Sequence, residues 1–187
     1  MNRDALKEIL LEYQATDDVE AERRTRMLAL LESEGDPFSR DHMVPGHFTA
    51  STFVLSPDGR SILLILHQKL GLWLQPGGHV DPGDTDIFAA AARELREETS
   101  LWAGSADTVP ALLDIDIHTI PENPSKGEPA HEHFDIRVLF HSKHLDVEVG
   151  TDALDARWVE LDDIGNEATD ESVMRAVRKI RFRSDLC

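Results

Sequence analysis

The segment 77–101 constrains the fold more than any other part of the chain. It opens with two glycines, continues through the loop HVDPGDTD and ends in the alanine-rich run IFAAAARELREETSL. Alanine, leucine and glutamate are strong helix formers, whereas the preceding glycines, proline and aspartates are typical of loops and helix starts. The pattern predicts a helix that begins near Thr85 or Asp86, ends near Ser100 and follows a glycine-rich loop.

Three carboxylates lie on one face of this predicted helix. Glu94, Glu97 and Glu98 have the spacing i, i+3 and i+4, and Arg93 lies four residues before Glu97. Like charges this close repel unless a cation neutralises them, and Mg²⁺ or Mn²⁺ takes oxygen ligands of this kind. A solvated acidic helix face is the simpler alternative. The glycine-rich loop favours a site, because glycines let the backbone approach a metal or an anion closely.

The rest of the chain predicts further strands and helices. The run 47–55, the turn 56–60 and the apolar run from Ser61 indicate a β-hairpin. A short strand is expected at LWLQP, and strands 112–120 and 131–140 are expected to form a second hairpin. A further strand begins near Asp155. A basic helix follows from Glu171, with one apolar side formed by Val173, Ala176, Val177 and Ile180. The irregular alternation favours a mixed α+β fold over a repeated βαβ series.

Two amphipathic helices precede these elements. Apolar residues recur at helical spacing over 3–14 and again over 18–34, and the Pro- and Gly-containing stretch 35–46 follows. We expect residues 1–45 to form an N-terminal helical extension and 46–187 to form the main domain. The sequence leaves three roles open for the extension: covering the site, forming a homodimer contact, or packing on the sheet.

Composition excludes several classes of partner. The chain has 36 Asp and Glu against 19 Lys and Arg, a net charge of −17, which opposes binding to a nucleic-acid backbone or an anionic membrane. No apolar run reaches membrane-spanning length, and the charged N-terminus is unlike a secretory signal, so we expect a cytoplasmic protein. The one cysteine is Cys187, so any metal must be held by oxygen or imidazole.

The segment from Gly78 to Leu101 resembles the signature of the Nudix hydrolases, Gx5Ex7REUxEExGU, in which U is a bulky aliphatic residue. The positions that match by type are Gly78, Arg93, Glu94, Leu95, Glu97, Glu98 and Leu101. The acidic position after the glycine is Asp84 instead of Glu, and eight residues instead of seven separate it from Arg93. Ser100 replaces the expected glycine, and so lacks the easy left-handed conformation that glycine offers.

This resemblance implies an α/β/α sandwich around a mixed β-sheet and hydrolysis of a nucleoside diphosphate linked to another group X. It implies that Glu94, Glu97 and Glu98 hold divalent cations, that Arg93 orients Glu97, and that the Gly78 carbonyl adds a ligand. The implied cofactor is Mg²⁺ or Mn²⁺, and the implied partner is a small nucleotide-type substrate. Attack of water on a pyrophosphate needs an activated nucleophile and a counter-charge on the phosphate, which such a site provides.

Polar residues alternate along the two strands of the second hairpin, and residues two apart share a face. The residues on these faces are Asp114, Asp116 and His118, and His131, His133, Asp135 and Arg137. We expect them to form a wall of the substrate cleft, in which His118, His131, His133 and Arg137 bind substrate. The solvent side of an antiparallel sheet is the alternative, and an independent His/Asp metal site is a third.

Two roles near the site need further residues. A loop acid is a candidate for the general base, and we favour Glu128, which precedes Pro129, over Glu122 and Glu132. His79 follows Gly78 directly and either reaches the substrate phosphate or packs on the loop.

A divalent-metal-dependent Nudix pyrophosphohydrolase is thus the leading hypothesis. A catalytically inactive nucleotide-binding or regulatory module on the same fold is the alternative, motivated by Asp84, the extra loop residue and Ser100. An isomerase of prenyl diphosphates fits less well, because no cysteine lies near the signature.

Overall fold

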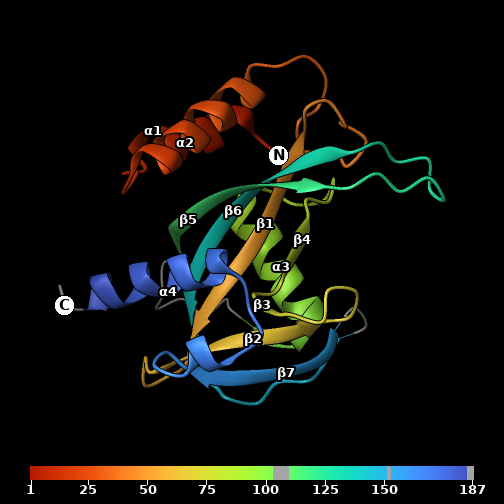
Figure 1. Cartoon of the computed structure of the whole chain (residues 1–187). Helices are drawn as coiled ribbons and strands as arrows, with labels where there is room; N and C mark the ends of the chain where they lie inside the picture. Colours follow the sequence, from red (N-terminus) through yellow and green to blue (C-terminus); the bar gives the residue numbers. More distant parts are fainter. Residues whose placement is uncertain (103–109, 151–152, 185–187) are drawn as a thin grey trace. The chain divides into compact units, whose positions relative to one another are not determined.

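The computed structural model describes residues 1–102, 110–150 and 153–184, and over these residues the chain forms one seven-stranded β-sheet, four α-helices and a short 3₁₀ helix (Figure 1). The strands are β1 (Gly46–Leu55), β2 (Ser61–His67), β3 (Trp73–Leu74), β4 (Gly77–His79), β5 (Ala111–Ile120), β6 (His131–His141) and β7 (Ala153–Glu160). The helices are α1 (Arg3–Glu12), α2 (Asp18–Leu31), α3 (Ile87–Thr99), η1 (Ile164–Asn166) and α4 (Glu171–Ser184). No helix in the described ranges has the length and apolar character needed to cross a membrane.

The sheet has the strand order β3-β2-β1-β6-β5, with β4 paired to β1 and β7 paired to β2. The predicted first hairpin is confirmed, because β1 and β2 pair antiparallel with Leu55 opposite Ile62. The second hairpin is also confirmed in outline, since β5 and β6 are neighbours. One expectation is wrong: we expected a loop from Gly77 onward, but Gly77–His79 is a short strand. Two glycines give no side-chain pattern, so this strand depends on its pairing with β1.

The chain divides into two compact units that interleave along the sequence. The first comprises Met1–Ala50, Gly78–Ala90 and Ile115–Ile136, and the second comprises the other described residues. The predicted boundary between residues 45 and 46 stays a prediction.

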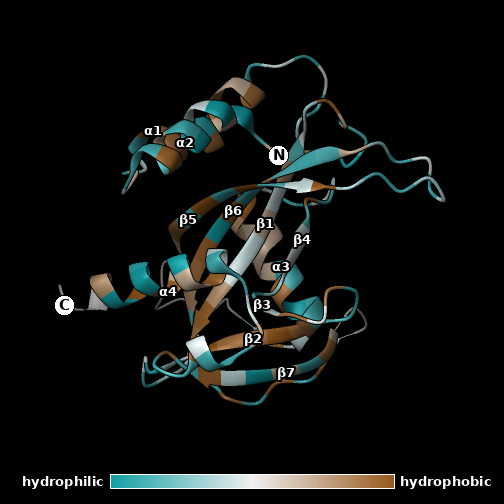
Figure 2. Ribbon diagram, viewed as in Figure 1, coloured by the Kyte–Doolittle hydropathy of each residue, from teal (hydrophilic) through white to brown (hydrophobic). Residues whose placement is uncertain are grey.

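The second unit has an apolar core that includes α4 and β2. The predicted apolar face of the C-terminal helix is confirmed, because Val173, Ala176, Val177 and Ile180 are all buried in this core. Ile62 and Leu64 of β2 belong to the same core, and β2 is hydrophobic along most of its length (Figure 2). Burial of these side chains is the main force that holds the unit together.

The first unit contains the two N-terminal helices, which end two to three residues earlier than predicted. Asn2 caps α1 by accepting from the Asp4 amide, and Asp17 caps α2 by accepting from the Glu20 amide. The buried apolar side chains of the pair are Leu6, Leu10, Met27, Leu30 and Leu31. The Phe48 ring of β1 lies 5.5 Å from Phe38 and 6.0 Å from Phe134 between ring centres, so aromatic packing extends from the loop after α2 to the sheet.

Candidate active site

The loop before α3 is fixed by two aspartates. The Asp86 carboxylate accepts from the Ala89 amide at 2.9 Å and therefore caps the helix, as the sequence predicted within a residue. Asp84, which is only 8% exposed, accepts from the Asp81 amide at 2.8 Å. The shorter acid at position 84 thus forms a local contact that stabilises the loop.

The carboxylates of α3 are held by specific donors. Arg93 Nη1 lies 2.8 Å from Glu94 Oε1 and 3.0 Å from Glu97 Oε2, so one guanidinium positions two of the three predicted ligands. The third, Glu98, accepts from the Gly77 amide at 2.9 Å. This hydrogen bond links one of the two glycines to the acidic helix.

The C-terminal end of α3 explains the missing glycine. Ser100 has φ 55°, so it adopts the left-handed conformation that we expected it to lack. The main-chain segment 148–150 covers this end: the Glu148 amide donates to the Thr99 carbonyl at 3.0 Å, and the Gly150 amide donates to the Glu98 carbonyl at 2.7 Å. A Cβ on Gly150 would lie 2.4 Å from the Glu97 carbonyl oxygen, so glycine is required for this approach.

The donor set on α3 fits a hard divalent cation. Glu94 has a side chain that is 14% exposed, whereas that of Glu97 is 57% exposed, so the acidic face extends from a sheltered position to solvent. Carboxylate and carbonyl oxygens are the ligands that Mg²⁺ and Mn²⁺ prefer. That Glu94, Glu97, Glu98 and the Gly78 carbonyl bind such an ion remains a prediction.

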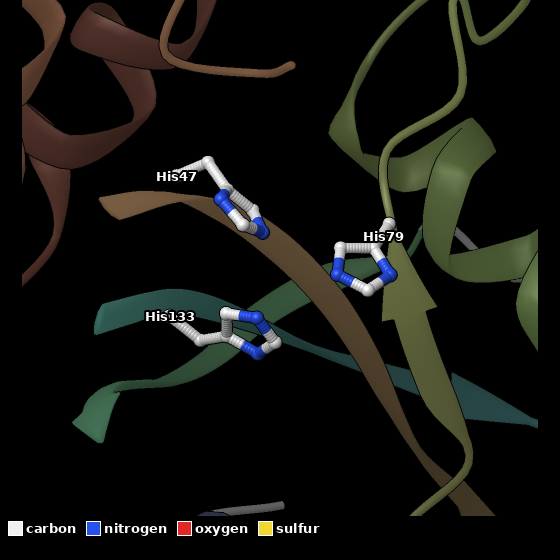
Figure 3. Close-up of side chains that lie close together, drawn as sticks. All are labelled: His47, His79 and His133. Atoms are coloured by element: carbon white, nitrogen blue, oxygen red, sulfur yellow. The ribbon is translucent and has the colours of Figure 1, made fainter. Parts of the chain in front are cut away.

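Histidines gather in the first unit, on three strands that are neighbours in the sheet. His47 of β1, His79 of β4 and His133 of β6 have ring centres 4.8 to 5.2 Å apart (Figure 3). His131 lies 5.2 Å from His47, and His118 lies 5.4 Å from His133. The structure therefore brings together the four histidines that we predicted as substrate ligands and adds His47 to them.

Three of these imidazoles, His47, His79 and His133, are neutral at pH 7, because the pKa of each is lowered. Burial and the nearby His47 ring lower the pKa of His79 to about 4, and the same causes lower the pKa of His133 to about 2. Burial also lowers the pKa of His47, although its hydrogen bond to the His42 carbonyl opposes that change. Neutral imidazoles have a nitrogen lone pair available for a metal or a donor, but supply no positive charge for phosphate.

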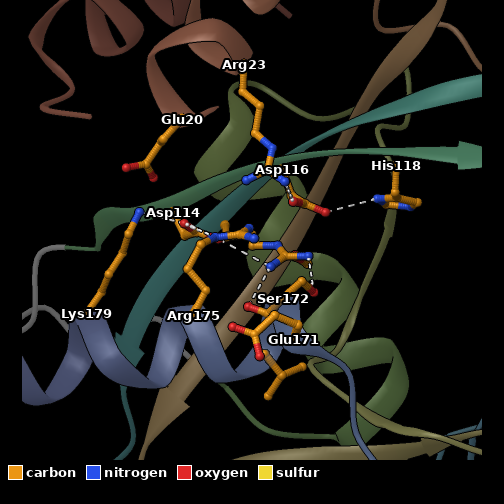
Figure 4. A network of polar contacts seen from close by, with 12 residues as sticks. Glu20, Arg23, Asp114, Asp116, His118, Glu171, Ser172, Arg175 and Lys179 are labelled. Atoms are coloured by element: carbon orange, nitrogen blue, oxygen red, sulfur yellow. Dashed lines mark hydrogen bonds and ion pairs between the residues drawn. The ribbon is translucent and has the colours of Figure 1, made fainter. Parts of the chain in front are cut away.

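Arg137, the fifth predicted substrate ligand, belongs to a buried ionic cluster in the second unit, whose members labelled in Figure 4 are Asp114, Arg175 and Lys179. Asp114 of β5 lies 3.2 Å from Arg137, 2.8 Å from Arg175 and 2.6 Å from Lys179. The Asp114 and Arg137 side chains are 0% and 3% exposed. Two residues of α4 thus cover this part of the polar strand face, so neither an open cleft wall nor a solvent face describes Asp114 and Arg137.

The remaining polar residues of β5 and β6 pair inside the first unit. Arg23 of α2 lies 3.1 Å from Asp116, and His118 lies 3.5 Å from the same carboxylate (Figure 4). Asp135 accepts from the Thr49 hydroxyl at 3.0 Å. The Arg23–Asp116 pair shows that α2 contacts the polar face of β5 in the first unit.

The loop acids differ in their surroundings. Glu132 forms an ion pair with Arg26 of α2, which reduces its availability as a base. Glu128 pairs through its main chain with Asn123 in the turn between β5 and β6, where Glu122 lies exposed on the surface. The assignment of Glu128 as general base remains a prediction.

His47 is the site residue that the sequence analysis missed. A signal was available: His47 and Thr49 alternate with Phe48 and Ala50, the same period-2 pattern that identified the polar face of β6. The partners of Asp114 had no such signal, because Arg175 and Lys179 are more than 60 residues away in sequence.

Three comparisons place this geometry among known proteins. A curated relative is 28% identical over 149 residues, covering 80% of this chain and 84% of its own length; it is the probable DHNTP pyrophosphohydrolase of Lactococcus lactis subsp. cremoris. The NUDIX domain of Shewanella oneidensis NrtR complexed with ADP ribose is similar with a TM-score of 0.57 at 17% identity, over 73% of this chain and 86% of that one.

A MutT NUDIX hydrolase from Burkholderia pseudomallei has a TM-score of 0.54 at 22% identity, over 71% of this chain and 95% of its own. At these identities the two solved structures support the fold alone. The fold is of the α+β type, and the helices α1 and α2 precede its sheet in the chain. The family model for the NUDIX domain matches residues 45–179, which is most of the chain. The chain therefore belongs to the Nudix family, as the resemblance of its loop and acidic helix predicted.

Proposed function

We propose that this protein is a Nudix pyrophosphohydrolase that requires a divalent metal and cleaves a nucleoside diphosphate linked to another group X. The observation that carries the proposal is the positioning of the three α3 glutamates, with Arg93 between Glu94 and Glu97 and the Gly77 amide on Glu98. An acidic face that served only solubility would not need an arginine and a backbone amide directed at its carboxylates.

In this proposal Glu94, Glu97, Glu98 and the Gly78 carbonyl hold Mg²⁺ or Mn²⁺. When bound, the cation supplies Lewis acidity and a counter-charge for the phosphate oxygens. Arg93 keeps two carboxylates in place and balances part of their charge, and Gly77 fixes the third. A carboxylate of this set, or Glu128, accepts the proton of the attacking water.

Two of the three departures that motivated the alternative, an inactive module, have a local structural explanation. Asp84 hydrogen-bonds within the loop, and Ser100 adopts the conformation expected of glycine. The relatives suggest two substrates to test, DHNTP from the name of the Lactococcus relative and ADP-ribose from the Shewanella domain. Nucleoside triphosphates and nucleotide sugars complete the panel.

The test measures cleavage of the pyrophosphate bond of each substrate in the panel. Each reaction contains Mg²⁺ or Mn²⁺ and is repeated with a chelator. We expect turnover of at least one substrate that depends on the added cation. Glu97→Gln and Glu98→Gln should each lower the rate by at least about 100-fold, because each removes a charged metal ligand. Glu8→Gln, which changes an exposed residue of α1, is the control and should keep the full rate. Turnover that survives both substitutions, or the absence of any turnover, would contradict the proposal.

A further inference from the structure

We propose that His47, His79 and His133 form a second metal site, which binds one divalent transition-metal ion of the Zn²⁺ type. Each side chain offers one ring nitrogen, and these nitrogens all lie within 4.8 Å of one another. Among the described residues, no other group of three or more histidines, cysteines or acids has ligand atoms gathered in this way. The site shares no residue with the carboxylate set of α3.

The separation of the three rings matches a tetrahedral centre. For a Zn–N bond of about 2.0–2.1 Å, each ring centre lies about 3.2 Å from the ion, and two such centres are then about 5.2 Å apart. The observed separations are 5.2 Å for His47 and His79, 4.8 Å for His47 and His133, and 5.1 Å for His79 and His133. The rings therefore need to rotate, so that their nitrogens turn inward, without a change in the spacing of the strands.

His47 is prepared as a ligand by its own hydrogen bond. Its Nδ1 lies 3.2 Å from the His42 carbonyl, which can only accept, so Nδ1 carries the proton and Nε2 carries the lone pair. His47 is 1% exposed, and its Nε2 has no hydrogen-bond partner within the part of the chain that the structure describes. A buried nitrogen of this kind is costly unless something binds it. A backbone carbonyl on one ring nitrogen and a metal on the other is the usual arrangement of a metal-ligating histidine.

The main chain also holds the strands at the spacing that the site needs. A Cβ on Gly46 would lie 1.8 Å from the Glu132 carbonyl oxygen, so only glycine permits this approach between β1 and β6. The Glu132 amide donates to the Pro45 carbonyl at 3.0 Å at the same point. Gly46 directly precedes the proposed ligand His47 on one strand, and Glu132 directly precedes His133 on the other.

Imidazole nitrogen determines which metals bind. It suits Zn²⁺, Co²⁺, Ni²⁺ and Cu²⁺, whereas Mg²⁺ and Ca²⁺ prefer oxygen. Three protein ligands leave the fourth position of a tetrahedral ion open to water or to an anionic oxygen, as in catalytic zinc sites. We therefore infer that the chain holds two classes of metal site, one of carboxylates for a hard ion and one of imidazoles for a softer ion.

Calorimetric titration of the full-length, chelator-treated protein with Zn²⁺ tests the proposal, together with the visible absorption of added Co²⁺. We expect one equivalent of Zn²⁺ and a Co²⁺ spectrum of tetrahedral intensity. Loss of an outer-shell partner already weakens metal binding about 10- to 100-fold, so His79→Ala and His133→Ala should each lower Zn²⁺ affinity by more than about 100-fold. His133→Gln keeps much of the side-chain volume and therefore disturbs the packing less than His133→Ala. Circular dichroism checks that each variant is folded.

Two controls separate this site from other ligands. His144→Ala removes an exposed histidine after β6 and should bind Zn²⁺ like the wild type. Glu97→Gln combined with Glu98→Gln should also keep the affinity, because the carboxylate set is not involved. The proposal fails if the wild type takes up no Zn²⁺, if folded His79 and His133 variants bind it unchanged, or if the glutamate variant loses it. None of these readouts requires turnover, so they are independent of the proposed hydrolase activity.

Discussion

Asp114 is a fully buried carboxyl group that lies close to three cationic side chains, and these surroundings determine its protonation. Burial alone raises the pKa of a carboxyl group, but the hydrogen bond from Arg175 and the charges of Arg137 and Lys179 outweigh it and lower the pKa below 3.8. The carboxylate therefore stays ionised, and the cluster depends on it. Three cations without that carboxylate would repel one another in a site that excludes water.

We predict that Asp114→Asn lowers the free energy of unfolding by about 3–5 kcal/mol at pH 7, the usual result of breaking a buried ion pair. Because the folded pKa lies below the ordinary value of 3.8, this stabilisation is complete above that pH and is lost as the pH falls through the lowered value. Urea unfolding of both proteins across the acid range measures it. The two stability curves should converge at low pH, and curves that remain parallel would contradict this account.

Arg93 permits a residue-scale test of the proposed hydrolase. Arg93→Lys replaces a guanidinium that contacts two carboxylates with a single point charge. We expect turnover to fall roughly 10- to 100-fold, as for other groups that orient metal ligands, and half-maximal activity to need more Mg²⁺. Titration of the rate with Mg²⁺ measures both effects. The control is Arg96→Lys. The Arg96 guanidinium lies 5.5 Å from the centre of the Trp102 ring, so its replacement should leave the rate and the Mg²⁺ requirement unchanged.

At the scale of elements, α3 ends in a backbone conformation that its sequence does not favour. Ser100 has a positive φ, and a left-handed residue other than glycine costs roughly 1–2 kcal/mol. The segment 148–150 holds this end through two main-chain hydrogen bonds. The tertiary contacts thus impose a conformation that local preference opposes.

Ser100→Gly should therefore raise the free energy of unfolding by about 1 kcal/mol, since it removes this strain. Some of the gain is offset by the greater freedom of glycine in the unfolded chain and by loss of the 3.3 Å contact between the Ser100 hydroxyl and Glu148. Ser100→Ala is the matched control: it loses the hydroxyl but keeps the strain, so it should not stabilise. Thermal unfolding of the three proteins measures the difference, and equal stability of the glycine and alanine variants would refute the explanation.

The elements that the sequence predicted well have strong local signals. The bounds of α3 follow from its alanines and its Asp86 cap, and the apolar side of α4 follows from helical periodicity. The contacts that it could not predict join distant segments. Nothing near Asp114 points to Lys179, and the pairing of β4 with β1 has no local pattern. The glutamates of the candidate site share one helix and could be grouped from spacing alone, whereas His47 joins His133 only through the strand order.

At the scale of the whole molecule, the net charge is −17, yet two of the arginines have specific acidic partners. Arg23 and Arg26 of α2 pair with Asp116 and Glu132 on the sheet strands of the first unit. The N-terminal helices thus supply positive charge to acids on β5 and to the start of β6. Because α1 and α2 belong to the same compact unit as these strand segments, we propose that residues 1–45 contribute to folding instead of being a detachable extension.

Arg23 provides the sharpest test of that role. Its side chain is 21% exposed and that of Asp116 is 7% exposed, so Arg23→Met keeps the aliphatic packing but removes the guanidinium that lies 3.1 Å from this buried carboxylate. We predict a loss of about 3 kcal/mol in the free energy of unfolding, measured by urea denaturation at pH 7. Lys7→Met, in the exposed pair with Glu32 on the outer side of the helices, should cause no measurable loss, because exposed ion pairs are screened by water. If Arg23→Met behaves like Lys7→Met, the Arg23–Asp116 pair adds no electrostatic support to the sheet strands of the first unit.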